Sequence, residues 1–209
     1  MRHAILVLHG YTMNGSIGAS AERLLQPLGA RLRVVAPDAP LECSEEAVSR
    51  FYQGTGLQRA QGPYRTWWRA NEDNSRYEGW PETLASLRAQ MREHAPVGVL
   101  GFSQGAMVAA LIAALSARGE LPALRFAILV AGRLPRAREL EPLFIEPIEL
   151  PSLHVWGERD AFSVSSAPEL MERFAERTRR SFSWPAGHTL PTRGVAAQAI
   201  VDFVEAGLP

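Results

Sequence analysis

The chain has 209 residues, of which 46% are hydrophobic and 21% are charged, a composition typical of a soluble globular domain. Its 22 basic and 22 acidic residues give a formal net charge of +0, so no overall charge favours binding to nucleic acid or to an anionic membrane. The single cysteine, Cys43, excludes an intrachain disulfide, and its acidic neighbours should raise its pKa and leave an inert thiol.

The start of the chain carries no feature of a secretory or membrane protein. The apolar run after Met1-Arg2-His3 ends at Leu8, which makes it too short for the hydrophobic region of a signal peptide. No later stretch approaches the ~20 apolar residues of a membrane-spanning helix. We therefore expect a cytoplasmic protein with no membrane span.

Short apolar strands alternate with helical segments along the whole chain. Strands are predicted at residues 4–8, 32–36, 97–100, 124–130, 153–156 and 181–184. Helices are predicted at residues 16–28, 80–94, 106–115, 168–178 and 195–204. This alternation predicts an α/β fold: one domain over residues 1–209, built on a mostly parallel sheet of about six strands with helices on both faces.

Residues 41–77 interrupt the alternation. They show no helical or strand periodicity, and they contain several glycines followed by the aromatic pair Trp67-Trp68. Irregular insertions of this length are usually functional or disordered, and the aromatic residues argue against disorder. The insertion is interpreted as part of the wall of a substrate pocket, with a plain lid over the edge of the core as the alternative. Residues 134–150 form a second irregular passage.

The segment Gly101-Phe102-Ser103-Gln104-Gly105 lies between an apolar strand and a long apolar helix. Glycines that flank a serine at such a turn let the strand and the helix pack closely around a strained backbone, and the turn lifts the serine hydroxyl above the sheet. A Gly-x-Ser-x-Gly pattern also occurs by chance in glycine-rich loops. The strand before it and the helix after it favour Ser103 as a nucleophile.

A serine nucleophile needs a base that works near pH 7, and the neutral imidazole of histidine is the suitable side chain. His3 lies at the wrong end of a strand, His94 at a helix end and His154 inside a strand. His9 follows the first strand, close to the expected site. His188 lies after the last strand, in a glycine-containing loop, and is the predicted base.

The imidazole in turn needs a carboxylate that fixes its orientation. Asp160 directly follows the penultimate strand, and Glu158 is its nearest rival. Asp38 also follows a strand, but its Pro-Asp-Ala-Pro setting indicates a turn residue that bonds its own backbone. Asp160 is the predicted acid, and the chain order Ser103, Asp160, His188 is the one expected of the α/β-hydrolase fold.

Two amide N–H groups must hold the negative charge that develops on the substrate's carbonyl oxygen. The amide of Gln104, at the start of the helix, is the first predicted donor of this oxyanion hole. The second is predicted in the loop after the first strand, where Gly10 allows close approach; Tyr11 is chosen there, and Thr12 stays an alternative. This chemistry needs no metal ion and no organic cofactor.

At these residues the chain resembles the FSH serine hydrolases, a family of the α/β-hydrolase superfamily. The resemblance runs nearly end to end and rests on Leu8-His9-Gly10-Tyr11, Trp67-Trp68, Tyr77-Glu78-Gly79, Gly101-Phe102-Ser103-Gln104-Gly105, Gly157-Glu158-Arg159-Asp160 and Gly187-His188. It implies a triad of Ser103, Asp160 and His188 that acts on carboxylic esters or thioesters with fairly long acyl chains.

The predicted partner is a small-molecule acyl ester or thioester, with Trp67, Trp68 and Phe162 as candidate lining residues of an apolar pocket. Other functions stay open at this point: an acyltransferase, a thioesterase that releases a carrier-bound product, or a binding module that kept the fold without catalysis. A dienelactone-hydrolase-like enzyme is disfavoured, because such enzymes commonly use cysteine where this chain has Ser103. Apolar surface around the closing helix leaves a homodimer as a further open point.

Overall fold

The computed structural model describes residues 2–209 and is built on one six-stranded sheet. The strands are all parallel and lie in the order β10-β9-β8-β7-β1-β2. They are β1 (His3–Leu8), β2 (Leu32–Val35), β7 (Gly98–Phe102), β8 (Phe126–Val130), β9 (Ser152–Gly157) and β10 (Arg179–Trp184). The prediction of a parallel sheet covered by helices is confirmed.

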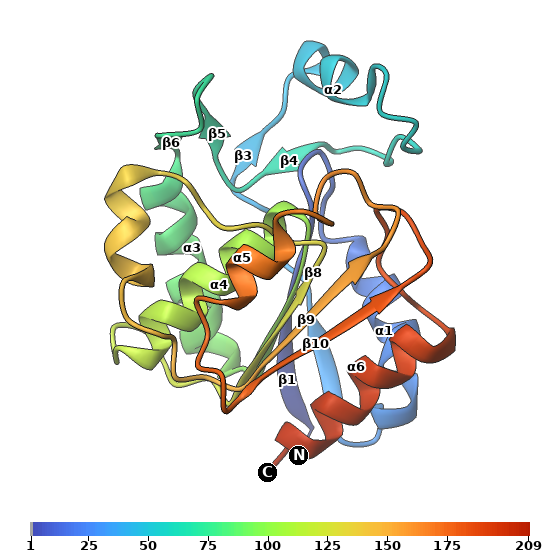
Figure 1. The fold of residues 1–209 in the computed structure, drawn as a ribbon, viewed down its shortest axis with the longest axis vertical. Helices are drawn as coiled ribbons and strands as arrows, with labels where there is room; N and C mark the ends of the chain where they lie inside the picture. Colours follow the sequence, from blue (N-terminus) through green and yellow to red (C-terminus); the bar gives the residue numbers. More distant parts are fainter. Residues whose placement is uncertain (1) are drawn as a thin grey trace.

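Helices cover both faces of the sheet (Figure 1). On one face lie α1 (Ile17–Leu24) and α6 (Gly194–Gly207), and on the other lie α3 (Trp80–His94), α4 (Gln104–Ala117) and α5 (Ala167–Met171). Two 3₁₀ segments, η1 (Gln26–Leu28) and η2 (Arg138–Phe144), follow α1 and β8. Helix α5 is shorter than predicted, because the chain turns after Met171 and Phe174 pairs with Ile148. Among residues 2–209, no helix has the length and apolar character needed to cross a bilayer.

The strands alternate their side chains between two cores. In β1, Leu6 and Leu8 pack on the α3–α4 side, while Ile5 and Val7 pack on the α1–α6 side. A strand buried on both faces reads as a continuous apolar run, which explains the pattern at residues 4–8. Helix α4 is buried at every residue from its start to Ser116, so it has no polar face. Its N-terminus lies at the carboxyl edge of the sheet.

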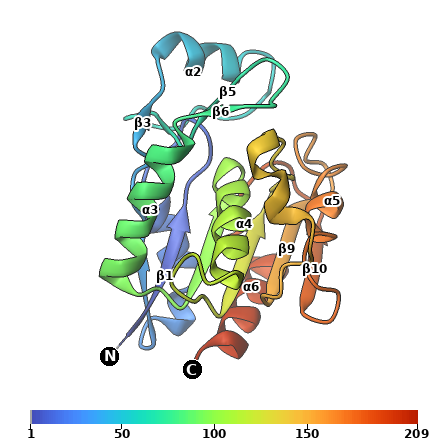
Figure 2. The same cartoon turned by 90° about the vertical axis from the view of Figure 1, so that its left-hand side faces the viewer.

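Residues 41–77 are more regular than predicted. They contain helix α2 (Glu45–Tyr52) and two small antiparallel sheets, β3 (Leu41–Glu42) with β4 (Arg65–Thr66) and β5 (Arg69–Ala70) with β6 (Tyr77–Glu78). These strands have two residues each, which is too short for any periodicity to appear in the sequence. The insertion lies over the carboxyl ends of the sheet strands (Figure 2), where parallel α/β folds bind their ligands.

Candidate active site

The turn between β7 and α4 carries Ser103. Its backbone has φ 56° and ψ −118°, a conformation that costs a non-glycine residue about 1–3 kcal/mol. The flanking glycines make the turn possible: a Cβ atom on Gly101 would collide with the carbonyl oxygen of Gly105, and a Cβ atom on Gly105 would collide with that of Leu8. The close packing holds the Ser103 hydroxyl at the edge of the sheet, beside the N-terminus of α4.

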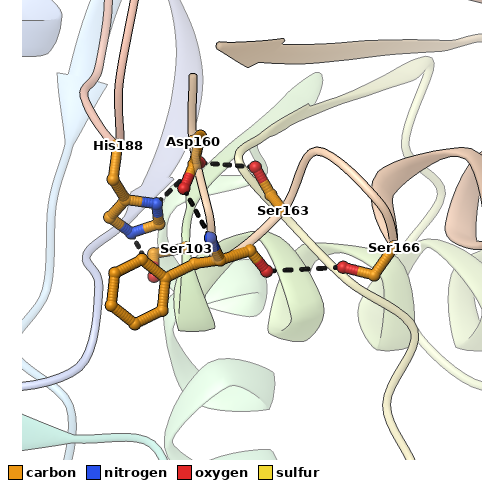
Figure 3. Close-up of polar contacts among 6 residues, drawn as sticks. Ser103, Asp160, Ser163, Ser166 and His188 are labelled. Carbon is orange, nitrogen blue, oxygen red and sulfur yellow. Dashed lines mark hydrogen bonds and ion pairs between the residues drawn. The ribbon is translucent and has the colours of Figure 1, made fainter. Parts of the chain in front are cut away.

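The structure brings Ser103, Asp160 and His188 together in one hydrogen-bonded chain (Figure 3). The Nε2 atom of His188 is 2.9 Å from the Oγ atom of Ser103, and its Nδ1 atom is 2.8 Å from Oδ2 of Asp160. The three residues follow β7, β9 and β10, whose carboxyl ends share one edge of the sheet. The rival Glu158 is exposed and accepts a hydrogen bond from Ser183 at 3.2 Å instead.

The carboxylate of Asp160 is kept ionised by the groups around it. Burial by itself raises the pKa of Asp160, but the hydrogen bonds from His188, from the Ser163 hydroxyl and from the Phe162 amide, 2.9 Å away, together hold that pKa below its ordinary value. Both carboxylate oxygens are therefore occupied (Figure 3). An ionised carboxylate on Nδ1–H orients the imidazole so that Nε2 faces Ser103 and can accept a proton.

His9 organises the loop that packs against the nucleophile. Its buried ring accepts the amide N–H of Ala39 on Nε2 at 3.0 Å, so Nδ1 carries the proton and donates to the carbonyl oxygen of Gly10 at 2.8 Å. Burial lowers the pKa of His9 to about 4, and the ring is neutral near pH 7. A Cβ atom on Gly10 would lie 3.2 Å from the Cβ atom of Ser103, so the loop and the nucleophile are in close contact.

The side chain of Gln104 ties the insertion to the nucleophile turn. Its Oε1 atom accepts from the Thr66 hydroxyl at 3.0 Å and from the Trp67 amide at 3.1 Å, and its Nε2 atom donates to the Trp68 carbonyl oxygen at 3.2 Å. The indole N–H of Trp67 donates to the carbonyl oxygen of His9 at 2.8 Å. These groups are buried, where a lost partner leaves an unsatisfied polar atom, so the insertion is fixed firmly to the sheet edge.

Two cavities open on Ser103 and His188. The Trp68 cavity has a volume of about 440 Å³, and its lining includes Tyr11, Phe51, Trp68, Tyr77, Met107 and Phe162. The Leu57 cavity has a volume of about 450 Å³, and its lining includes Tyr11, Met13, Ile17, Phe51, Leu57 and Leu190. Both volumes suit a small-molecule ligand. Tyr11 and Phe51 line both cavities, and their rings meet edge to face with centroids 5.1 Å apart.

Of the three predicted pocket residues, Trp68 and Phe162 line the Trp68 cavity, whereas Trp67 lines neither cavity. Trp67 is fully buried behind the wall, with its ring centroid 5.0 Å from that of His9, which corrects its predicted role as a lining residue. Trp68 stacks on Tyr77, with ring centroids 4.4 Å apart and an interplanar angle of 6°. The two tryptophans lie at the bend between β4 and β5, and only Trp68 faces the cavity.

A family model described as serine hydrolase (FSH1) matches residues 1–200. The chain belongs to this family. Esterase OVCA2 of Bos taurus is 37% identical over 141 residues, which cover 65% of this chain and 61% of that protein. Esterase OVCA2 of Danio rerio is 29% identical over 221 residues, which cover 96% of each chain. These relatives are named esterases, and this chain is an esterase of the serine hydrolase (FSH1) family.

A solved structure shows the same fold. SOBER1 of Arabidopsis thaliana superposes with a TM-score of 0.67 at 18% identity, and the match covers 100% of both chains. An identity this low supports the fold alone, and that fold is the expected α/β-hydrolase fold.

Several features of the FSH1 chain's site differ from the sequence predictions or were missed by them. Asp38 accepts the amide N–H of Gly15 at 2.6 Å, across the loop after β1, and does not bond its own backbone. The pKa of the Cys43 thiol is raised, as expected, but burial is the main cause and the neighbouring glutamates are not. Ser163 gave no signal, because a hydroxyl three residues after an aspartate is common in any turn. Within residues 2–209, no group of three or more histidine, cysteine, aspartate or glutamate side chains is placed to hold a metal ion.

Proposed function

We propose that this chain hydrolyses carboxylic esters or thioesters through an acyl-enzyme on Ser103. The observation that carries the proposal is the unbroken hydrogen-bonded chain from Ser103 through His188 to Asp160, located where two cavities meet. Two cavities at one nucleophile give the acyl group and the leaving group separate places. The insertion at residues 41–77 supplies walls to both, and the proposed catalytic unit is a single domain.

In the first half-reaction, the Nε2 atom of His188 takes the proton of Ser103 as the serine oxygen attacks the carbonyl carbon. Asp160 stabilises the imidazolium that forms. The bond to the leaving group then breaks, and the imidazolium gives its proton to the departing alcohol or thiol. In the second half-reaction a water molecule attacks the acyl-enzyme by the same route, which releases the acid and restores Ser103.

The amides of Tyr11 and Gln104 are proposed to hold the oxyanion. Both residues line the Trp68 cavity together with Ser103, and neither amide N–H donates to a protein acceptor within residues 2–209. Gln104 is the first residue of α4, where the helix dipole favours negative charge. The alternative donor, Thr12, is fully buried and lines neither cavity, which supports the choice of Tyr11.

The proposal is tested by p-nitrophenyl esters from acetyl to palmitoyl, together with a fluorophosphonate probe that reacts with activated serines. Wild type should hydrolyse the esters and be labelled. Ser103→Ala should lose labelling and should lower kcat roughly 10⁴-fold or more, because the nucleophile acts as a unit with its base and acid. Circular dichroism checks that the variant is folded.

Ser181→Ala is the matched control, since Ser181 is an exposed serine on β10 that lines neither cavity. It should be labelled and should turn over like wild type. Retained turnover in folded Ser103→Ala would refute the assignment of the nucleophile. Labelling of Ser103 without ester turnover would favour the transferase or carrier-bound thioesterase alternatives. The cytoplasmic location and the homodimer stay predictions from the sequence.

A further inference from the structure

The charges around the two cavities differ. The charged side chains that line the Trp68 cavity are Arg69 and Arg133, and no carboxylate side chain lines it. The Leu57 cavity has one charged lining residue, Arg59, besides the histidine that both cavities share. Arg59 is already paired with Glu45 and donates to the Tyr64 hydroxyl at 2.9 Å. Both charged side chains of the Trp68 cavity are therefore positive, and no acidic side chain lines that cavity beside them.

Arg133 has fewer polar partners than Arg69. Within residues 2–209, its guanidinium forms no ion pair and no hydrogen bond with another side chain or with the backbone, whereas Arg69 donates to the Glu42 carbonyl oxygen at 2.9 Å and lies 3.7 Å from the Glu78 carboxylate. A guanidinium presents several donors in a planar fork that fits a carboxylate. Arg133 is thus available to a ligand.

The backbone before Arg133 is held in an unusual conformation. Ala131 has φ 54°, in the left-handed region that non-glycine residues rarely adopt, and its amide donates to the Val155 carbonyl oxygen at 2.8 Å. The next residue, Gly132, lies so close to α4 that a Cβ atom on it would be 2.8 Å from the Cβ atom of Ala106. This tight, strained exit from β8 brings residue 133 to the cavity rim beside the nucleophile helix.

The Trp68 cavity suits the acyl part of a substrate. Its lining includes Gln104 and Met107 on the helix that begins directly after Ser103, so a group bonded to the Ser103 oxygen can extend into it. The Leu57 cavity is lined by Thr189 and Leu190, which follow His188, the proposed proton donor to the leaving group. A leaving group must lie where His188 can protonate it, and we assign it to the Leu57 cavity, beside the residues that follow His188.

We propose that Arg133, assisted by Arg69, selects acyl groups that carry a carboxylate at their far end. The preferred substrates are then monoesters or monothioesters of dicarboxylic acids: an apolar chain lies against the stacked Trp68 and Tyr77 rings, and its anionic end meets Arg133 at the rim. This inference rests on the proposed function, because it needs an acyl group bonded to Ser103. It adds the substrate class and the residue that selects it.

The test compares matched acyl chains on the full-length enzyme. Mono-p-nitrophenyl adipate and suberate carry a terminal carboxylate, and p-nitrophenyl hexanoate and octanoate are their neutral counterparts. Wild type should have a higher kcat/KM for the anionic member of at least one pair. Arg133→Gln should lower kcat/KM for that anionic ester roughly 10- to 100-fold, the range for a hydrogen bond to a charged group, and should change the neutral ester less than about twofold.

Arg138→Gln is the matched control: it removes the same charge from the connection after β8, in which both arginines are exposed, and Arg138 lines neither cavity. It should keep the anionic preference. The preference of wild type should also weaken as salt is added, since the contact is at a solvent-exposed rim.

Three outcomes would overturn the inference while leaving the proposed esterase chemistry intact. Wild type could turn over neutral and anionic esters equally. Arg133→Gln could lower both esters by the same factor, which would make Arg133 a structural residue. Finally, the preference could appear only when the carboxylate is on the leaving group, as in the hexanoyl ester of 4-hydroxybenzoate, which would refute the assignment of the acyl group to the Trp68 cavity. If wild type neither hydrolysed the neutral esters nor reacted with the fluorophosphonate probe, the proposed function itself would be rejected.

Discussion

The Trp68 cavity and the Leu57 cavity share Ser103 and His188, but their outer walls are held in different ways. The wall of the Trp68 cavity is buried: Trp68 stacks on Tyr77, Trp80 meets Trp68 edge to face at 6.1 Å, and the Thr83 hydroxyl donates to the carbonyl oxygen of Trp67. The outer wall of the Leu57 cavity is residues 57–61, all of which are half-buried or exposed. Its hydrogen bonds are made within the insertion and to the loop after β1, and they include the Ala60 amide on the Tyr52 hydroxyl at 3.1 Å.

This difference indicates a division of tasks. A wall of close-packed aromatic rings keeps one shape and discriminates by size, because interiors packed at crystal density tolerate little extra volume. A wall of exposed backbone opens locally at small free-energy cost and adapts to its ligand. We therefore expect this esterase to be selective for the acyl group and tolerant of the leaving group. The remaining predictions test that contrast.

The largest effect is expected from acid, which should protonate two histidine rings that are buried as neutral groups. Burial lowers the pKa of His9 to about 4 and that of His154 to about 3. In the unfolded chain each ring keeps the ordinary histidine pKa of 6.5 and is protonated once the pH falls below that value. The unfolded state therefore binds more protons as the pH falls, and the free energy of unfolding should decrease between pH 6.5 and about 4. Moving from pH 7 to pH 5 should cost about 2 kcal/mol for each histidine.

Urea unfolding at pH 7 and pH 5 measures this loss. His154→Gln is the matched variant, because His154 lies in β9 and lines neither cavity, so the variant should lose roughly half of the pH dependence. Asp160 does not contribute in this window: its pKa is depressed, so the stability that it adds is lost only at lower pH. Equal stability at pH 7 and pH 5 would contradict the burial of both rings as neutral groups.

The second effect separates the cavities by filling one of them. Met107 is 6% exposed and lines the Trp68 cavity from α4, and Met107→Trp should occupy part of the acyl space. We expect kcat/KM for octanoyl esters to fall roughly 100-fold, while acetyl esters, which need little of that space, change by less than about threefold. The p-nitrophenyl ester series measures both values on one enzyme preparation.

Ser20→Trp is the control for the added indole, because Ser20 is a half-buried residue that lines only the Leu57 cavity. It should leave the dependence on acyl length unchanged and should discriminate among leaving groups of different size. If Met107→Trp fails to fold by circular dichroism, Met107→Phe makes the same test with less added volume. Equal losses for acetyl and octanoyl esters would show that the acyl chain does not enter the Trp68 cavity.

The same contrast explains what could be predicted from the sequence. The sheet, its covering helices and the close approach of Ser103, Asp160 and His188 follow from patterns that are local in the chain: apolar runs, glycines at the turn and polar residues directly after strands. Each of these signals has a physical cause that acts within about ten residues, so it is readable without a structure. For this reason the predicted α/β fold was confirmed.

The walls of the cavities depend on contacts between distant residues and could not be predicted. The anchoring of Trp67 and Trp68 by the Gln104 side chain joins positions more than thirty residues apart, and the sequence around Trp67 gives no sign of which tryptophan faces inward. Arg133 has no local motif either. Its inferred role in binding a carboxylate depends on the absence of negative charge among the other residues that line the Trp68 cavity. That absence is a property of the assembled cavity.

The smallest expected effect compares one anchor from each wall. Asn14 is 7% exposed, and its Nδ2 atom donates to the carbonyl oxygens of Gln61 at 2.9 Å and Pro63 at 2.8 Å, so it holds the outer wall of the Leu57 cavity. Asn14→Ala releases carbonyl groups of exposed residues, which water can satisfy, and should lower the free energy of unfolding by only about 1 kcal/mol. The KM of this variant should rise a few-fold for esters with bulky leaving groups. The dependence of KM on the length of the acyl chain should stay unchanged.

Thr83→Val makes the corresponding change behind the Trp68 cavity, because it removes the hydroxyl that donates to the Trp67 carbonyl oxygen and keeps the side-chain shape. That carbonyl oxygen is in a buried region, so the variant should lose about 1–3 kcal/mol, more than Asn14→Ala, and should blur the dependence on acyl length. Urea unfolding shows which of the two variants loses more stability. Esters that vary in acyl length and esters that vary in leaving group show which selectivity each variant changes. If both variants changed acyl and leaving-group selectivity alike, the two walls would behave as one flexible lid, and the insertion would be a cover over both cavities without a separate acyl site.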